Sequence, residues 1–187
     1  MSKTTHKKID SKGFTVWFTG LACSGKSTLA DALVPILKKK GFKVERLDGD
    51  IVRQSLTKDL GFSVEDRRKN IERVAFVAKM LTRNDVVVLA TFISPEIGMR
   101  DNARKEIGNF VEVYVKCSVE GCMKRDVKGM YKKALAGQIK DFTGVHASAP
   151  YEEPPNPELV VDTEKISIED GVKQVLSKLV ELGYIKP

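Results

Sequence analysis

Short apolar runs alternate with longer segments of helical periodicity along this chain. The runs that predict strands are Phe14–Thr19, Lys43–Leu47, Val86–Thr91, Phe110–Val115 and Leu159–Val161. Several are apolar at consecutive positions, as buried strands of a parallel sheet are. Alternation of such runs with helices is typical of parallel strands joined by crossover helices. The pattern therefore predicts an α/β fold with a doubly wound, mostly parallel sheet.

Between these runs, apolar residues recur at helical spacing. They predict helices at Lys26–Lys40 and Val64–Arg83, after Pro95, from about Val119, and at Ile168–Leu182. Gly41 directly follows the first stretch, and helices commonly end before a glycine. The helices supply the crossovers that the predicted sheet requires.

The segment 126–157 breaks this regular alternation. It is rich in Lys, Gly and Pro and weak in periodicity. An ordinary surface loop has that composition too, but structureless loops of this length are uncommon in compact domains unless they have a function. We therefore predict a lid at residues 126–157.

The length and composition fit one soluble domain. With 187 residues, 42% hydrophobic and 30% charged, the chain is long enough for one core and unlike a disordered protein. We expect a single domain over residues 1–187, with a flexible, lysine-rich tail at residues 1–12. Three cysteines without a C-x-x-C pair indicate reduced thiols. No apolar run approaches the length of a membrane span, so we expect a cytoplasmic protein that binds no membrane.

The net charge of +7 is compatible with a partner that carries phosphate or sulfate. Nucleic-acid binding would be better supported by a basic stripe with interleaved aromatic residues. Aromatic residues make up only 7% of this chain and are spread along it. We therefore expect no nucleic-acid partner.

The segment Gly20–Ser27, GLACSGKS, matches the phosphate-loop pattern G-x-x-x-x-G-K-[ST]. It follows a predicted strand and opens a predicted helix, which is the context that the motif requires. Its backbone N–H groups would face the phosphates, Lys26 would reach the β and γ oxygens, and Ser27 would bind Mg²⁺. A turn that only connects strand to helix would not need the Lys-Ser pair. The residues predicted to bind ATP here are Gly20, Leu21, Ala22, Cys23, Ser24, Gly25, Lys26, Ser27 and Thr28.

Two acidic residues, Asp48 and Asp50, follow the second predicted strand. Ligands of open α/β sheets bind outside the carboxyl ends of the strands, where these side chains would project. One carboxylate can help to hold Mg²⁺, which we assign to Asp48 together with Ser27. The other, Asp50, can orient and deprotonate an acceptor hydroxyl. An Asp-Gly turn with a helix N-cap at Asp50 is the alternative interpretation, and it is compatible with catalysis.

Six segments, taken in order, resemble the adenylylsulfate kinase family. They are GLACSGKS, LDGDIVR, GFSVEDRRKN, TFISP, DVKGMYKKA and KDFTG, and together they extend over nearly the whole chain. The resemblance implies a P-loop kinase that uses ATP and Mg²⁺ to phosphorylate the 3′-hydroxyl of adenosine 5′-phosphosulfate. The residue pattern alone stops at a small-molecule kinase.

The resemblance also implies residues that bind the acceptor. Arg53, Arg67 and Asn70 match positions that hold the phosphosulfate and its ribose, and guanidinium groups suit such anions. The alternative for them is a solvated helix face. Phe62 matches an aromatic residue that stacks on the acceptor adenine, although a hydrophobic staple would also explain it.

Ser94 matches a serine described in the family as a phosphoserine intermediate, and Ile93 matches a residue beside the acceptor nucleotide. The alternative for Ser94 is a helix N-cap before Pro95 at the first helical position. Direct in-line transfer needs no covalent step. The family's arginines shortly after this serine are replaced here by Ile97, Gly98 and Met99.

In the predicted lid region, the resemblance places Arg125 and Lys128 on the ATP side, and Lys133 and Phe142 in a segment that closes over the acceptor. A guanidinium such as that of Arg125 can stack on an adenine. Exposed loop lysines often have no specific role.

Together these observations predict an adenylylsulfate kinase that forms a homodimer and is functionally coupled to ATP sulfurylase. Two alternatives stay open at this point. One is another small-molecule kinase of the nucleoside or shikimate type. The other is a nucleotide-dependent regulatory or nucleic-acid-binding module, although no switch segment or second binding region is recognisable.

Overall fold

The computed structural model describes residues 13–187, so the tail predicted for residues 1–12 lies outside the described residues. Its strands are β1 (Thr15–Thr19), β2 (Lys43–Asp48), β3 (Val86–Thr91), β4 (Phe110–Lys116) and β5 (Leu159–Asp162). All pairings among them are parallel, in the order β2-β3-β1-β4-β5. The predicted α/β fold with a parallel sheet is confirmed, and each strand boundary lies within one residue of its prediction.

The helices are α1 (Lys26–Lys39), α2 (Gly49–Gln54), α3 (Val64–Thr82), α4 (Ile97–Ile107), α5 (Val119–Arg125), α6 (Met130–Leu135) and α7 (Ile168–Glu181). Serine N-caps begin three of them: Ser63, Ser118 and Ser167 each accept a backbone N–H of the first turn. Helical periodicity did not predict α2 and α6, because six residues are too few to show it. Among residues 13–187, no helix is both long enough and apolar enough to span a bilayer.

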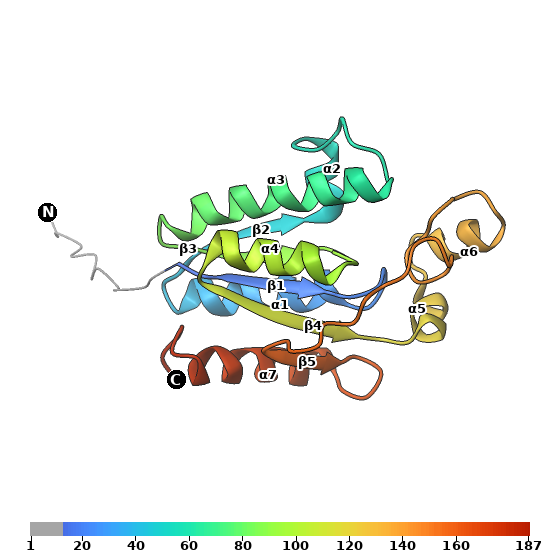
Figure 1. Cartoon of the computed structure of the whole chain (residues 1–187). Coiled ribbons are helices and arrows are strands. Elements are labelled where there is room, and N and C mark those ends of the chain that lie inside the picture. The colour runs from blue at the N-terminus through green and yellow to red at the C-terminus, as the bar shows by residue number, and fades with distance from the viewer. Residues whose placement is uncertain (1–12) are drawn as a thin grey trace, which may run out of the picture.

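Helices cover both faces of the sheet (Figure 1). One face packs against α1 and α7 through residues such as Leu33 and Leu179. The other packs against α3 and α4, and there the indole of Trp17 stacks between Phe92 and Phe110. This double covering explains why β1, β3 and most of β4 are buried on both sides.

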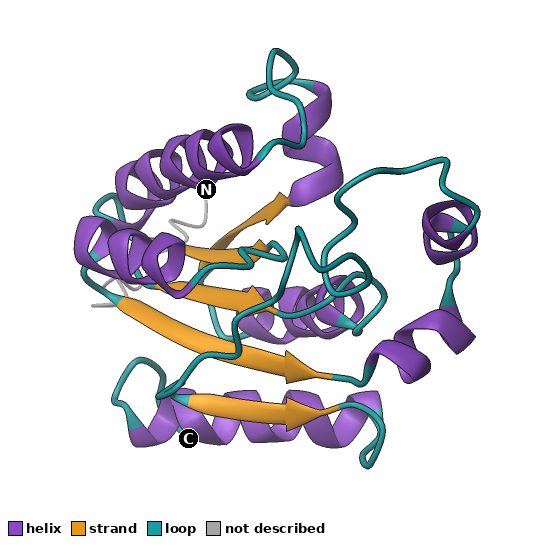
Figure 2. Cartoon of the chain, turned by 45° about the vertical axis from the view of Figure 1, so that its right-hand side comes forward, coloured by secondary structure: helices purple, strands orange, loops and turns teal. Residues whose placement is uncertain are grey.

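A third, smaller core lies at the carboxyl ends of the strands, where α5 and α6 project from the sheet (Figure 2). It joins the predicted lid to the phosphate loop: Tyr131 of α6 donates its hydroxyl to the Ala22 carbonyl at 3.0 Å and packs edge-on against Phe142. The segment predicted to be a lid therefore has a packed base.

Candidate active site

The phosphate loop, Gly20–Ser27, connects β1 to α1, and its glycines meet steric requirements. Gly20 has φ +146°, and a Cβ there would lie 2.4 Å from the Val115 carbonyl oxygen. Gly25, at φ +105°, forms the N-cap of α1. Only glycine adopts these conformations without strain. Ser27 and Thr28 follow as exposed residues in the first helical turn.

Lys26 is folded back into the loop. Its Nζ donates to the Gly20 carbonyl at 2.9 Å and to the Leu21 carbonyl at 2.6 Å, and the residue is 9% exposed. Burial lowers the pKa of Lys26 to about 8. The ammonium thus has dipolar partners and, among residues 13–187, no carboxylate in direct contact, so it is suited to pair with an incoming anion.

Asp48 lies at the centre of a hydrogen-bond network at the end of β2. Its Oδ2 accepts from Ser27 Oγ and Thr91 Oγ1, both at 2.8 Å. Its Oδ1 accepts the Asp50 N–H, so Asp48, and not Asp50, is the N-cap of α2. Burial alone would raise the pKa of Asp48, but these hydrogen bonds and the charge of Arg46 outweigh it and lower the pKa. Asp48 is therefore ionised at neutral pH.

Asp50 projects from the first turn of α2 towards the lid. Its carboxylate forms an ion pair with Lys128, which lies between α5 and α6. Both side chains are largely exposed, at 67% and 62%. The hydrogen bond to Asp50 raises the pKa of Lys128. The pair connects the lid to the strand end that carries the two acidic residues.

Arg53 and Arg67 form a positively charged region beside the start of α3. Arg53 donates to the Gly61 carbonyl at 2.8 Å, and its guanidinium lies 4.3 Å from the centroid of the exposed Phe62 ring. Burial and the nearby charge of Arg67 lower the pKa of Arg53. Two guanidinium groups held in mutual repulsion favour binding of an anion.

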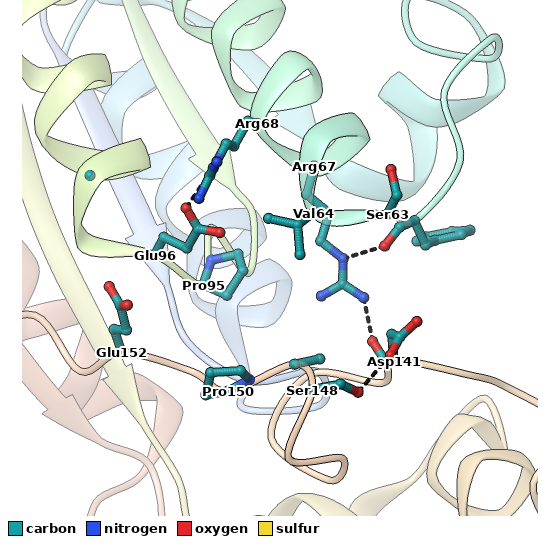
Figure 3. A pocket seen from close by; sticks show the side chains of 13 residues that line it. Ser63, Val64, Arg67, Arg68, Pro95, Glu96, Asp141, Ser148, Pro150 and Glu152 are labelled. Carbon is teal, nitrogen blue, oxygen red and sulfur yellow. Dashed lines mark hydrogen bonds and ion pairs between the residues drawn. The ribbon is translucent and has the colours of Figure 1, made fainter.

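Arg67 also contacts the lid. Its Nε donates to the Phe62 carbonyl at 2.8 Å, and its two Nη atoms donate to Thr143 Oγ1 and the Asp141 carbonyl. Around this contact lies a cavity of about 480 Å³, bounded by the start of α3, the β3–α4 loop and residues 141–152 (Figure 3). The figure shows the Arg67 guanidinium between Ser63 and Asp141, at the edge of that cavity.

Asn70 and Ser94 lie in the interior. Asn70 is 4% exposed, and its Oδ1 accepts from Thr57 Oγ1 at 2.7 Å. Ser94 is 2% exposed, accepts the Trp17 indole N–H at 3.1 Å and lies 3.1 Å from Thr19 Oγ1, to which it donates. Thr19 in turn donates to the Ile93 carbonyl at 2.8 Å. The prediction that Ser94 caps a helix is wrong: Ser94 has φ +39°, and α4 begins at Ile97 with Glu96 as its N-cap.

The other predicted lid residues separate into three positions. Arg125 lies against the phosphate loop, where its Nη1 donates to the Ser24 carbonyl at 3.2 Å and to Thr163 Oγ1 at 2.9 Å. Lys133 is exposed on α6. Phe142 is 8% exposed and packs into the lid core, and its N–H donates to His146 Nδ1.

Comparison with known proteins determines the family. The family model described as "Adenylylsulphate kinase" matches residues 12–162. The chain belongs to the adenylylsulfate kinase family. It is 56% identical over 170 residues to a probable adenylyl-sulfate kinase of Pseudomonas aeruginosa, covering 91% of this chain and 78% of that protein. It is 54% identical to an adenylyl-sulfate kinase of Halothermothrix orenii, covering 94% of each chain.

A solved structure of the same family has the same fold. It is the Mycobacterium tuberculosis APS kinase CysC in complex with AMPPNP and APS, with a TM-score of 0.86, 40% identity, and 90% of this chain and 98% of that chain covered. A probable bifunctional SAT/APS kinase of Sorangium cellulosum is 50% identical over 92% of this chain, which spans 29% of that protein. The activity of this chain is adenylyl-sulfate kinase activity, which decides against a nucleoside or shikimate kinase and against a regulatory module.

Three residues near this kinase site were not predicted from the sequence. Arg46 and Thr91 both contact Asp48, and Arg100 is buried behind the β3–α4 loop. A signal for Thr91 existed, since it ends the strand that pairs with β2 and lies in register with Asp48. Arg46 and Arg100 had no comparable signal, because an isolated arginine in a strand or helix is usually solvated.

Proposed function

We propose that this enzyme transfers the γ-phosphoryl group of ATP to the 3′-hydroxyl of adenosine 5′-phosphosulfate, giving ADP and 3′-phosphoadenylyl sulfate. One observation carries the proposal: the phosphate loop, Asp48 and Asp50 at the end of β2, and the Arg53–Arg67 region lie together at the carboxyl edge of the sheet. Donor phosphates, an acceptor hydroxyl and an anionic acceptor group would thus converge in one place.

On the donor side, residues Gly20–Thr28 would enclose the ATP phosphates and Arg125 would lie beside them. The AMPPNP in the Mycobacterium tuberculosis enzyme supports this assignment. Ser27 Oγ and the Asp48 carboxylate, 2.8 Å apart, offer the oxygen ligands that Mg²⁺ prefers, and phosphates and water would complete its coordination. The ion would neutralise phosphate charge as the phosphoryl group moves.

On the acceptor side, Asp50 would orient the 3′-hydroxyl and accept its proton. In the present structure the ion pair with Lys128 engages one oxygen of that carboxylate, Oδ2, so the other oxygen can accept the proton. Lys26 would stabilise the charge on the transferred group. The residues proposed to contact the sulfonucleotide are Arg53, Phe62, Arg67, Asn70, Ile93, Lys133 and Phe142.

Transfer is proposed to be direct, with no obligatory phosphoserine. Ser94 is the candidate for such an intermediate, but it is buried, and its hydroxyl is engaged with Trp17 and Thr19. Attack by this oxygen on ATP would require the loop to unfold locally. In-line transfer to the acceptor hydroxyl requires no such step.

We further propose a single kinase domain in which residues 126–157 act as the lid, a homodimeric assembly, a cytoplasmic location and functional coupling to ATP sulfurylase. The relative from Sorangium cellulosum supports the coupling, because its name joins a SAT to an APS kinase.

An ADP-release assay with adenosine 5′-phosphosulfate, AMP, nucleosides and shikimate tests the proposed substrate. We expect turnover with the sulfonucleotide at a kcat/KM far above the others, and a product that carries the new phosphate on the 3′-oxygen. Equal turnover of AMP would mean that Arg53 and Arg67 do not recognise the phosphosulfate.

A further inference from the structure

Arg100, in α4, is a charged side chain in the protein interior, with 2% of its side chain exposed. Its Nη1 donates to the Ser94 carbonyl at 2.6 Å, and its Nη2 donates to the Glu152 carbonyl at 2.7 Å. Its Nε lies 2.9 Å from Glu112 Oε1 on β4. The guanidinium therefore joins three segments that are distant in the sequence.

The two carbonyls belong to segments that form opposite walls of the cavity around Arg67, which we call the acceptor cavity because its lining residues Phe62 and Arg67 are proposed to bind the acceptor. Ser94 precedes Pro95 and Glu96, which line the cavity from the β3–α4 loop. Glu152 and Pro150 line it from the C-terminal part of the predicted lid, residues 126–157, and Figure 3 shows the two pairs facing the same space. A guanidinium that holds both carbonyls sets the distance between the two walls.

Other bonds join the same walls but depend on the same alignment. The Glu152 N–H donates to the Pro95 carbonyl at 2.8 Å, and the Ile97 N–H donates to Glu152 Oε2 at 2.6 Å. The Tyr151 hydroxyl lies 2.9 Å from Thr19 Oγ1, within the network that contains Ser94. Hydrogen bonds weaken steeply with distance and misalignment, so a shift of the Ser94 or Glu152 carbonyl would disturb these bonds.

Stability alone does not explain a charge at this position. Buried ion pairs are often replaceable by apolar residues without loss of stability. Glu112 is 8% exposed on its side chain and is shared with Arg104, which itself pairs with Glu158. What an apolar residue cannot replace is the fork of N–H groups that holds two carbonyls at fixed positions.

We infer that Arg100 is a positioning residue for the sulfonucleotide: it fixes the β3–α4 loop and the C-terminal part of the predicted lid, and thereby the shape of the acceptor cavity. The inference rests on the proposed assignment of that cavity to the acceptor. It assigns no contact between Arg100 and the substrate, and it leaves the ATP side unaffected.

The principal test is Arg100→Lys, because an ammonium retains the charge opposite Glu112 but lacks the planar fork. We expect the KM for adenosine 5′-phosphosulfate to rise about 10-fold, since small misplacements of a binding wall are costly, while the KM for ATP changes by less than about twofold. A second variant, Arg100→Met with Glu112→Leu, removes both charges and should fold, with the same rise in KM.

Fluorescence supplies an independent readout. Trp17 is the one tryptophan of the chain, and its indole N–H donates to Ser94 Oγ. A displaced β3–α4 loop should change the emission of folded Arg100→Lys. A role in stability alone would lower the melting temperature but leave the emission of the folded protein unchanged.

Arg104→Met is the matched control. Arg104 lies on the same helix and contacts the same Glu112, but it donates to neither carbonyl. We expect it to lower the melting temperature while both KM values stay within about twofold of the parent enzyme. An equal rise in the acceptor KM with Arg104→Met would overturn the inference, because general loosening of α4 would then explain the effect.

Arg67→Ala distinguishes this inference from the proposed function. If Arg67→Ala raises the acceptor KM but both Arg100 variants keep it within about twofold, the positioning role is wrong and the proposed acceptor site stands. If Arg67→Ala also leaves the acceptor KM unchanged, the assignment of the cavity is itself wrong.

Discussion

The donor and acceptor sides of this site are built in opposite ways. Lys26 on the donor side bonds to carbonyls five and six positions away in the sequence, within one continuous loop. Arg67 on the acceptor side bonds to lid groups 74 and 76 positions away. The phosphate loop of the donor side is thus defined by local backbone geometry, whereas the Arg67 contacts of the acceptor side exist only when separate segments come together. Damage to the first should impair chemistry, and damage to the second should impair recognition.

The largest effect is expected on the donor side, from Lys26→Ala. The ammonium would stabilise charge that develops as the phosphoryl group transfers, so kcat should fall on the order of 10²-fold or more. Folding should survive, because the variant removes a buried charge. Steady-state kinetics measure the fall in kcat, and circular dichroism checks that the variant is folded. Lys39→Ala, at the exposed far end of the same helix, should behave as the parent enzyme. A Lys26→Ala enzyme with near-parental kcat would disprove the donor assignment.

Arg67→Ala tests the acceptor side and should act on KM. The loss removes a proposed partner of the sulfonucleotide and the bonds to Asp141 and Thr143, so the acceptor KM should rise about 10- to 100-fold. The ATP KM should change far less. Arg73→Ala is a suitable control, since Arg73 lies on the same helix and pairs with Asp59 on the surface. An equal rise in the KM values for both substrates would show that Arg67 has only a general structural role.

The same contrast explains what the sequence could predict. The phosphate loop is contiguous, and its strand–loop–helix context is visible in the residue pattern, so its location was predictable. Asp48 and Asp50 were identified because they follow a strand. The contacts of Arg67 with the lid were not predictable, because no local pattern encodes a pairing over such a separation.

Ser94 shows most clearly the limit of prediction from local sequence. Ser, Pro and Glu in succession are a strong signal for a helix start, yet α4 begins at Ile97. The hydroxyl bonds to Trp17 and Thr19 of β1, and the Arg100 side chain donates to the Ser94 carbonyl, where the backbone is in a left-handed conformation. Tertiary contacts here override a local preference that the sequence alone displays.

The pH dependence of kcat/KM for ATP should report on the donor side, with a smaller effect than either substitution. Burial lowers the pKa of Lys26 to about 8, so the ammonium that ATP requires is lost as the pH rises through that value. We expect kcat/KM for ATP to fall above pH 8, by about 10-fold at one unit higher. Stability should move the other way: the buried charge destabilises the ligand-free fold below about pH 8, and this penalty is relieved as the pH rises.

Melting curves of ligand-free protein from pH 7 to 9.5, compared with Lys26→Met, isolate that contribution. The variant lacks the titrating group, so the difference in melting temperature between it and the parent should shrink as the pH rises. A difference that stays constant across the range would show that the Lys26 charge carries no folding penalty.

The smallest effect is expected from Ser94→Ala, which lies between the two sides. Removing the hydroxyl leaves the Trp17 N–H unpaired and should cost about 1–3 kcal/mol of unfolding free energy, but kcat should fall only a few-fold if transfer is direct. Ser94→Gly makes a useful comparison, since glycine tolerates φ +39° and should relieve part of the backbone strain.

Rapid-quench measurements with γ-labelled ATP in the absence of acceptor test directly whether Ser94 is phosphorylated. An obligatory intermediate must appear as labelled enzyme at a rate at least equal to kcat and then pass its label to adenosine 5′-phosphosulfate. Such a species, together with complete loss of turnover in a well-folded Ser94→Ala enzyme, would refute direct transfer and require the β3–α4 loop to open during each catalytic cycle.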